Sequence, residues 1–137
     1  LLRIDGLPCV FYGDLYGIPA KNVPAVAELP TLMKIRELYA YGEQHDYFDH
    51  PDIIGWTRSG SDEVSGSGLA VVLSNRCGGS KRMYIGTNHT GKEFRDILGN
   101  CTNTVMIDED GCGEFSCTDG SVSVWLEKTL KVEVSLD

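Results

Sequence analysis

Acidic side chains are the residues of this sequence with the clearest capacity for chemistry. Asp14 stands two positions after the apolar run 8–12, and the catalytic groups of parallel barrels stand at the carboxyl ends of their strands. Capping of the following turn is the alternative role for Asp14. A second group of acids falls within ten residues: Glu43, Asp46, Asp49 and Asp52. These acids either gather oxygen ligands around a hard cation such as calcium or form a solvated acidic loop.

Other reactive residue types lack the spacing that their chemistry needs. The sequence has five cysteines, an odd number that argues against a complete disulfide framework, and no CxxC pair. The three histidines, His45, His50 and His89, are scattered, so a zinc site with four ligands is not indicated. Neither a GxSxG motif nor a phosphate-binding glycine loop is present. We interpret the cysteines as reduced and structural, which favours the cytoplasm.

Two tryptophans could stack on sugar rings. Trp56 and Trp125 both fall inside segments that we expect to be strands. A tryptophan in a strand of a small sandwich is more often part of the core, but an exposed one would provide a platform for carbohydrate.

Composition limits the classes of function. The chain has 137 residues, 42% of them hydrophobic, and a formal net charge of −8. Such a chain folds as an ordinary globular protein of about one domain. The acidic balance argues against nucleic acid as a partner, and no apolar run is long enough for a membrane helix. The sequence opens on an apolar run without an initiating Met, so we expect it to be a piece of a longer protein.

The first third of the chain predicts a strand followed by a helix. The apolar run 8–12 is typical of a strand buried on both faces. Residues 24–41 show helical spacing of apolar side chains, with Gly42 as the stop signal. Pro30 either kinks this helix or marks its true start. A single parallel strand needs sheet neighbours, which we expect to lie outside this sequence.

From about residue 53 the sequence predicts a separate β domain. Short apolar runs alternate with Gly, Asn, Asp and Ser clusters, as in antiparallel sandwiches. The expected strands are residues 53–57, 69–74, 82–86, 93–97, 104–107, 114–117 and 122–126.

Several segments, in order, resemble the alpha-amylase family of glycoside hydrolases, especially the bacterial liquefying and intracellular members. GLPCVFYGD at 6–14 is similar to the motif on the eighth barrel strand. HDYFDH at 45–50 and IIGWTR at 53–58 resemble the link into domain C and its first strand. MYIG at 83–86 and GSVSVW at 120–125 are similar to further segments of the same family, so the resemblance covers essentially the whole chain.

The resemblance implies a mainly β fold: an antiparallel Greek-key sandwich, domain C, preceded by one βα unit of a (β/α)8 barrel. It divides the chain into a strand–helix unit at 1–42, domain C at 43–128 and a tail at 129–137. It also implies a longer enzyme that hydrolyses internal α-1,4-glucosidic bonds of starch or glycogen with retention. That enzyme's nucleophile, acid/base and stabilising Asp lie on barrel strands four, five and seven, so this sequence contains no catalytic residue. Its expected partners are the α-glucan and its own barrel.

Calcium is the cofactor that the resemblance implies. In liquefying relatives its ligands between the barrel and domain C include a carboxylate at the position of Asp52, the carbonyl at Pro51 and an acid at Asn75. Asn75 retains an amide oxygen but loses a charge, so we expect a weak or empty site in this chain alone. We also expect the exposed 1–42 unit to self-associate, and a cytoplasmic rather than secreted location. A stand-alone carbohydrate-binding sandwich and a purely structural domain are the alternative functions.

Overall fold

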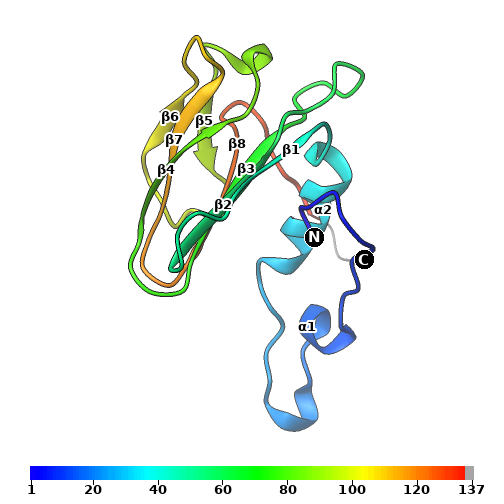
Figure 1. The fold of residues 1–137 in the computed structure, drawn as a ribbon. Helices are drawn as coiled ribbons and strands as arrows, with labels where there is room; N and C mark the ends of the chain where they lie inside the picture. Colours follow the sequence, from blue (N-terminus) through cyan, green and yellow to red (C-terminus); the bar gives the residue numbers. More distant parts are fainter. Residues whose placement is uncertain (135–137) are drawn as a thin grey trace.

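The computed structural model describes residues 1–134, and its β-rich part is a sandwich flanked by a helix (Figure 1). The elements are α1 (Tyr12–Tyr16), η1 (Pro19–Lys21), α2 (Leu29–Tyr39), β1 (Gln44–Tyr47), β2 (Ile53–Arg58), β3 (Leu69–Ser74), β4 (Gly79–Tyr84), η2 (Thr87–His89), β5 (Glu93–Asp96), β6 (Thr104–Met106), β7 (Cys112–Cys117) and β8 (Val122–Glu127).

One large sheet and one two-stranded ribbon make the sandwich. The sheet has the strand order β1-β2-β3-β8-β5-β6, and the ribbon pairs β4 with β7. The last strand, β8, lies between β3 and β5, so the connections cross over as in a Greek key. Every strand pairing among the described residues is antiparallel. The predicted antiparallel Greek-key sandwich is thus confirmed.

Both faces of the large sheet are covered. In β3, Ala70 and Val72 point to the ribbon, whereas Leu69 and Val71 belong to the cluster on the opposite face. This is why β3 reads as a continuous apolar run rather than an alternating one. On the ribbon side, the rings of Phe94, Phe115 and Trp125 pack edge to face, with ring centroids 6.3 and 5.8 Å apart along the series.

Helix α2 covers the other face. Ile35 is completely buried and Tyr39 nearly so, and both pack with Leu2 against the sheet. Pro30 stands in the first turn of α2, so it marks the start of the helix rather than a kink. The predicted stop, Gly42, has φ +85°, and a side chain there would collide with the backbone of Gly60. The sequence therefore needs glycine where the chain turns from α2 into β1.

The predicted strand at 8–12 does not form. These residues are extended or enter α1, and Leu7 and Phe11 are 94% and 64% exposed. A parallel strand requires parallel neighbours, and residues 1–134 contain none. The segment instead becomes part of an arm, residues 5–28, that projects away from the sandwich (Figure 1).

The C-terminal segment returns along α2. The hydroxyl of Tyr39 donates a hydrogen bond to the carbonyl of Lys131 at 3.3 Å, and Arg95 donates to that of Leu130 at 3.0 Å. Leu130 and Val132 also pack against the cluster beneath α2. Of the predicted tail at 129–137, residues 135–137 lie outside the described part of the chain.

Candidate functional site

The three residues predicted to face calcium lie together at one end of the sheet. Asp52 precedes β2 and Asn75 follows β3, and the pairing of Ile53 with Ser74 brings these ends side by side. The backbone N–H of Asn75 donates to the carbonyl of Asp52 at 3.1 Å. Pro51, Asp52 and Asn75 line one cavity of about 250 Å³. Antiparallel register therefore joins residues that are more than twenty positions apart in sequence.

This end of the sheet is held in shape by short-range hydrogen bonds. The backbone N–H of Asp52 donates to Nδ1 of His50 at 3.1 Å, and the hydroxyl of Ser74 donates to the carbonyl of Cys77 at 2.6 Å. Since His50 Nδ1 accepts that bond, the ring's acceptor side is turned to the backbone and is not free to ligate a metal.

The donor set fits calcium in chemical type but not in number. A carboxylate, an amide and a backbone carbonyl are hard oxygen donors, and Ca²⁺ takes six to eight of them. Within residues 1–134, His, Cys, Asp and Glu side chains nowhere gather in threes that could hold a metal ion. The described residues could therefore supply part of a calcium site.

The remaining acids of the 43–52 segment are distributed rather than gathered. Asp46 pairs with Arg3 at 2.8 Å, and Asp49 pairs with Lys81 at 2.5 Å. A hydrogen bond from Arg3 lowers the pKa of Asp46, and one from Lys81 lowers the pKa of Asp49. Asp46 lies in strand β1, a segment expected to be loop, whereas Asp49 lies beyond the end of that strand. The four residues of β1, Gln44–Tyr47, are mostly polar because β1 is the sheet's edge strand, and their side chains alternate in direction.

Neither tryptophan forms a sugar platform. Trp125 is completely buried, and its indole N–H donates to the hydroxyl of Ser123 at 2.8 Å. Trp56 is 9% exposed, and the guanidinium of Arg3 lies 5.4 Å from its ring centroid. The alternative of a stand-alone carbohydrate-binding module required an exposed tryptophan, so it loses its binding residue.

Asp14 likewise joins no constellation. It lies exposed in the first turn of α1, where its backbone N–H bonds to the carbonyl of Phe11 at 3.1 Å. Its carbonyl accepts the N–H of Val26 at 2.7 Å, which closes the base of the arm. The side chain of Asp14 is exposed and makes no hydrogen bond in the described part of the chain, so the expected capping of the following turn is not observed either.

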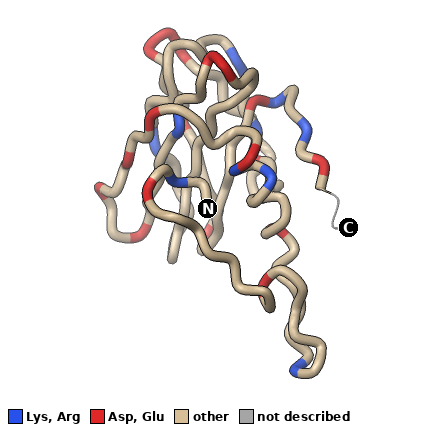
Figure 2. Tube along the Cα trace, turned by 90° about the vertical axis from the view of Figure 1, so that its right-hand side faces the viewer, with Lys and Arg blue, Asp and Glu red and all other residues tan. Residues whose placement is uncertain are grey.

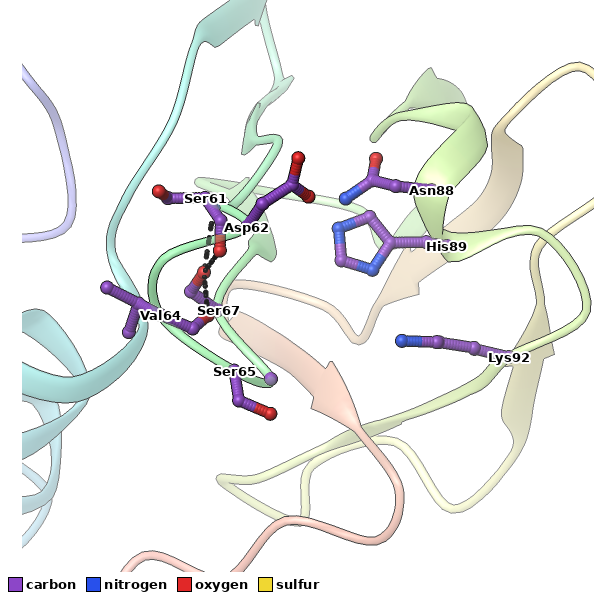
Figure 3. Close-up of a pocket in the computed structure, with 9 residues that line it drawn as sticks. Ser61, Asp62, Val64, Ser65, Ser67, Asn88, His89 and Lys92 are labelled. Carbon is purple, nitrogen blue, oxygen red and sulfur yellow. Dashed lines mark hydrogen bonds between the residues drawn. The ribbon is translucent and has the colours of Figure 1, made fainter.

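A second, polar cavity was not anticipated from the sequence. It measures about 210 Å³ and lies between the 61–67 loop and η2, with Ser61, Asp62, Asn88, His89 and Lys92 among its lining residues (Figure 3). The ring of His89 is 3% exposed, and its Nε2 lies 2.7 Å from the carbonyl of Ser59. A carbonyl only accepts, so Nε2 carries the proton and Nδ1 is an acceptor, without a partner in the described structure.

Burial sets the protonation of this histidine. Loss of hydration lowers the pKa of His89, although the bond to Ser59 opposes the shift. The ring also packs edge to face on Phe94, with centroids 5.5 Å apart. Local spacing in the sequence did not indicate this site, because its residues come from the 61–67 loop and from residues 88–92, which are far apart in the sequence. It lies beside the core, and no Phe, Tyr or Trp of the described residues lines it.

Comparison with known proteins now bears on these features. Residues 69–126 match the profile of a protein family described as "Alpha-amylase C-terminal". The chain is 53% identical over 133 residues to an alpha-amylase of Geobacillus stearothermophilus. The aligned region covers 96% of this chain and 24% of that protein. It is homologous to the C-terminal domain of bacterial alpha-amylases.

Two other relatives extend the homology. A glucan 1,4-alpha-maltohexaosidase of Bacillus sp. (strain 707) is 50% identical over 129 residues, covering 93% of this chain and 25% of that protein. The cytoplasmic alpha-amylase of Escherichia coli (strain K12) is 42% identical over 137 residues, covering 92% and 27%. The chain thus spans about a quarter of the length of the curated relatives that it matches. None of the described helices is long and apolar enough to cross a membrane.

Proposed function

We propose that this chain is the C-terminal part of an alpha-amylase that hydrolyses internal α-1,4-glucosidic bonds of starch or glycogen with retention. The observation that carries the proposal is the 53% identity over 133 residues to a bacterial alpha-amylase, together with the match of the sandwich strands to the C-terminal family. In this proposal residues 1–42 complete the catalytic barrel and residues 43–128 form domain C, which supports it.

The chain alone is inactive in this proposal. Retaining hydrolysis requires two carboxyl groups about 5–5.5 Å apart on either side of the scissile bond. The family's catalytic acids lie on barrel strands four, five and seven, and this chain carries none of the corresponding motifs. Pairing of Asp46 with Arg3 and of Asp49 with Lys81 further commits two of its acids to structural roles.

The arm supports the assignment of residues 1–42 to a larger body. Its apolar residues are turned outward: Leu7, Phe11, Tyr12 and Tyr16 are 53–94% exposed. Between residues 6 and 27 the only charged residues are Asp14 and Lys21, as the arm in Figure 2 illustrates. A solvated segment of this composition is unusual, whereas the last strand and loop of a barrel would bury these side chains against the rest of the barrel.

A reducing-sugar assay on soluble starch tests the activity. The purified 137-residue chain is expected to release no reducing ends, while the longer amylase from which it derives does so under the same conditions. Removal of residues 43–137 from that enzyme is expected to shorten its half-life at elevated temperature while leaving its catalytic acids in place. Turnover by the 137-residue chain would refute the proposal.

Calcium is proposed as the cofactor of the longer enzyme, with Asp52, Pro51 and Asn75 forming the domain C side of its site. The shared cavity of these residues supports this, and the small donor set supports weak binding by this chain alone. Calorimetry of the chain with CaCl₂ is expected to give no affinity in the micromolar range. Micromolar binding that Asp52→Ala abolishes would show that the chain's own ligands suffice.

A cytoplasmic location is proposed in preference to secretion. The odd number of cysteines favours a reducing compartment, and a relative 42% identical is named a cytoplasmic alpha-amylase. Fractionation of the source cells with an antibody to this chain would separate the two locations.

A further inference from the structure

Three arginines line a cavity between the N-terminal segment, α2 and β2. The cavity measures about 250 Å³, and Arg3, Arg36 and Arg58 form its polar wall. Each arginine comes from a different segment of the fold, and no Asp or Glu among residues 1–134 joins the lining. Positive charge is therefore concentrated here in a chain whose formal net charge is −8.

Two of these arginines have no acidic partner. Arg3 is compensated, since it pairs with Asp46 and Asp5 at 2.8 and 3.2 Å. Nη1 of Arg36 donates only to backbone carbonyls, those of Leu1 and Arg3. In the described part of the chain, no Asp or Glu forms an ion pair with Arg36 or Arg58.

Arg58 is the more unusual of the two because it is buried. It is 6% exposed, and the hydrogen bond that it makes is from Nε to the carbonyl of Gly42 at 3.0 Å. Burial, and secondly the neighbouring charge of Arg36, lowers the pKa of Arg58, while the charge of Asp5 opposes the shift; a guanidinium remains protonated in proteins. A buried charge without a direct ion-pair partner is costly, so an anion that enters the cavity is expected to stabilise the fold.

We propose that this cavity binds a small oxyanion through the guanidinium groups of Arg36 and Arg58, with Arg3 beside them. The planar fork of a guanidinium matches two oxygens of phosphate, sulfate or carboxylate. Two positive charges without ion-pair partners suit a divalent anion best, so inorganic phosphate or sulfate is the expected ligand. A carboxylate presents the same chemistry with one charge fewer.

The anion would fasten three segments to one another. Arg58 ends β2, Arg36 lies in the last turn of α2, and Arg3 belongs to the segment whose Leu2 packs beneath that helix. A shared anion thus ties α2 and the N-terminal segment to the sheet. The site lies at the opposite end of β2 from Asp52, so it is independent of the proposed calcium ligands.

Thermal unfolding of the 137-residue chain tests the site. At constant ionic strength, replacing sodium chloride with inorganic phosphate is expected to raise Tm by about 3 °C or more. Arg58→Gln should abolish that rise, which is the difference in Tm between phosphate and chloride for one and the same variant and so does not depend on the variant's own stability in chloride. The matched control is Arg76→Gln, which removes an exposed arginine outside the cavity and should retain the full rise.

Binding is measured independently of stability by NMR of the arginine Nε–H groups. Phosphate is expected to shift the signals of Arg58 and Arg36, and Arg36→Gln to raise the phosphate dissociation constant at least tenfold. Sodium acetate forms the second arm, and binding as tight as that of phosphate would assign the site to a carboxylate. The proposal fails if neither anion shifts these signals, or if Arg76→Gln weakens binding as much as Arg58→Gln.

Discussion

Asp96 holds a loop and a strand together with one carboxylate. The side chain is 5% exposed and accepts four backbone N–H groups at 2.8–3.0 Å. Three of these donors belong to the loop that follows β5, namely Leu98, Asn100 and Cys101, and the fourth is Val124 in β8. Asp96 therefore satisfies backbone groups that the β5–β6 connection would otherwise leave unpaired.

Asp96→Asn is expected to lower the free energy of unfolding by about 3 kcal/mol, because the amide NH₂ would face two N–H donors and leave them unpaired. Urea denaturation followed by tryptophan fluorescence measures the loss. Asp62→Asn, an exposed acid outside any hydrogen bond of the described structure, should change the free energy by less than about 0.5 kcal/mol. Equal losses in the two variants would contradict this role for Asp96.

His89 gives the fold a pH dependence of defined sign. Its pKa in the folded chain is lowered by burial, with Lys92 adding to the shift and Glu127 opposing it. The unfolded chain therefore takes up a proton near pH 6.5 that the folded chain resists, and stability falls as pH drops below that value. In His89→Gln the decline of Tm between pH 7 and pH 5 is expected to be shallower than in the parent chain. A decline unchanged by His89→Gln would remove His89 as its cause.

At the scale of single residues, the family resemblance indicated which residues lie together, whereas local spacing did not. The resemblance identified Asp52, Pro51 and Asn75 as neighbours, and the structure places them around one cavity. By contrast, no motif marks Asp96, and the IIGWTR segment marks Arg58 only as part of a strand, because what makes each unusual is burial and partners contributed by distant segments. Such surroundings are created by strand register and cannot be read from local spacing.

Among the elements, the sandwich strands were predicted more reliably than the flanking ones. The runs at 69–74 and 122–126 coincide closely with β3 and β8, since strands covered on both faces are apolar along their whole length. Expected starts at 82 and 114 were late for β4 and β7, whose first residues are small or polar. The strand expected at 8–12 is absent because pairing, not apolar composition, makes a strand.

Helix α2 depends on the sheet through one face. Ile35→Ala is expected to cost about 2–5 kcal/mol, because Ile35 is completely buried against the sheet and its removal leaves a cavity. Met33 lies in the same helix but is 37% exposed, so Met33→Ala should cost less than about 1 kcal/mol. Chemical denaturation compares the two. A loss at Ile35 no larger than that at Met33 would mean that α2 does not dock as described.

At the scale of the whole molecule, the question is which segments depend on one another for the stability of the fold. The sequence places the boundary between residues 42 and 43, yet the face beneath α2 contains Leu69, Val71, Val124 and Leu126 from the sandwich itself. These side chains are buried because α2 and Leu2 cover them. The helix is therefore an integral layer of the sandwich as well as the proposed last helix of the barrel, whereas the arm contributes little to this core.

Two truncations separate these contributions. A chain of residues 29–137 keeps α2 and loses the arm and Leu2, so it should unfold cooperatively with a stability lower by about 2–4 kcal/mol. A chain of residues 43–137 also loses α2, and the uncovered apolar face should make it aggregate or bind a hydrophobic dye. Sedimentation and calorimetry distinguish the two outcomes.

The 29–137 chain should also show less concentration-dependent self-association than the intact chain, because it lacks the exposed Leu7 and Phe11. A cooperative, monomeric 43–137 would show that domain C needs no cover, and the boundary at residue 42 would then be energetic as well as topological.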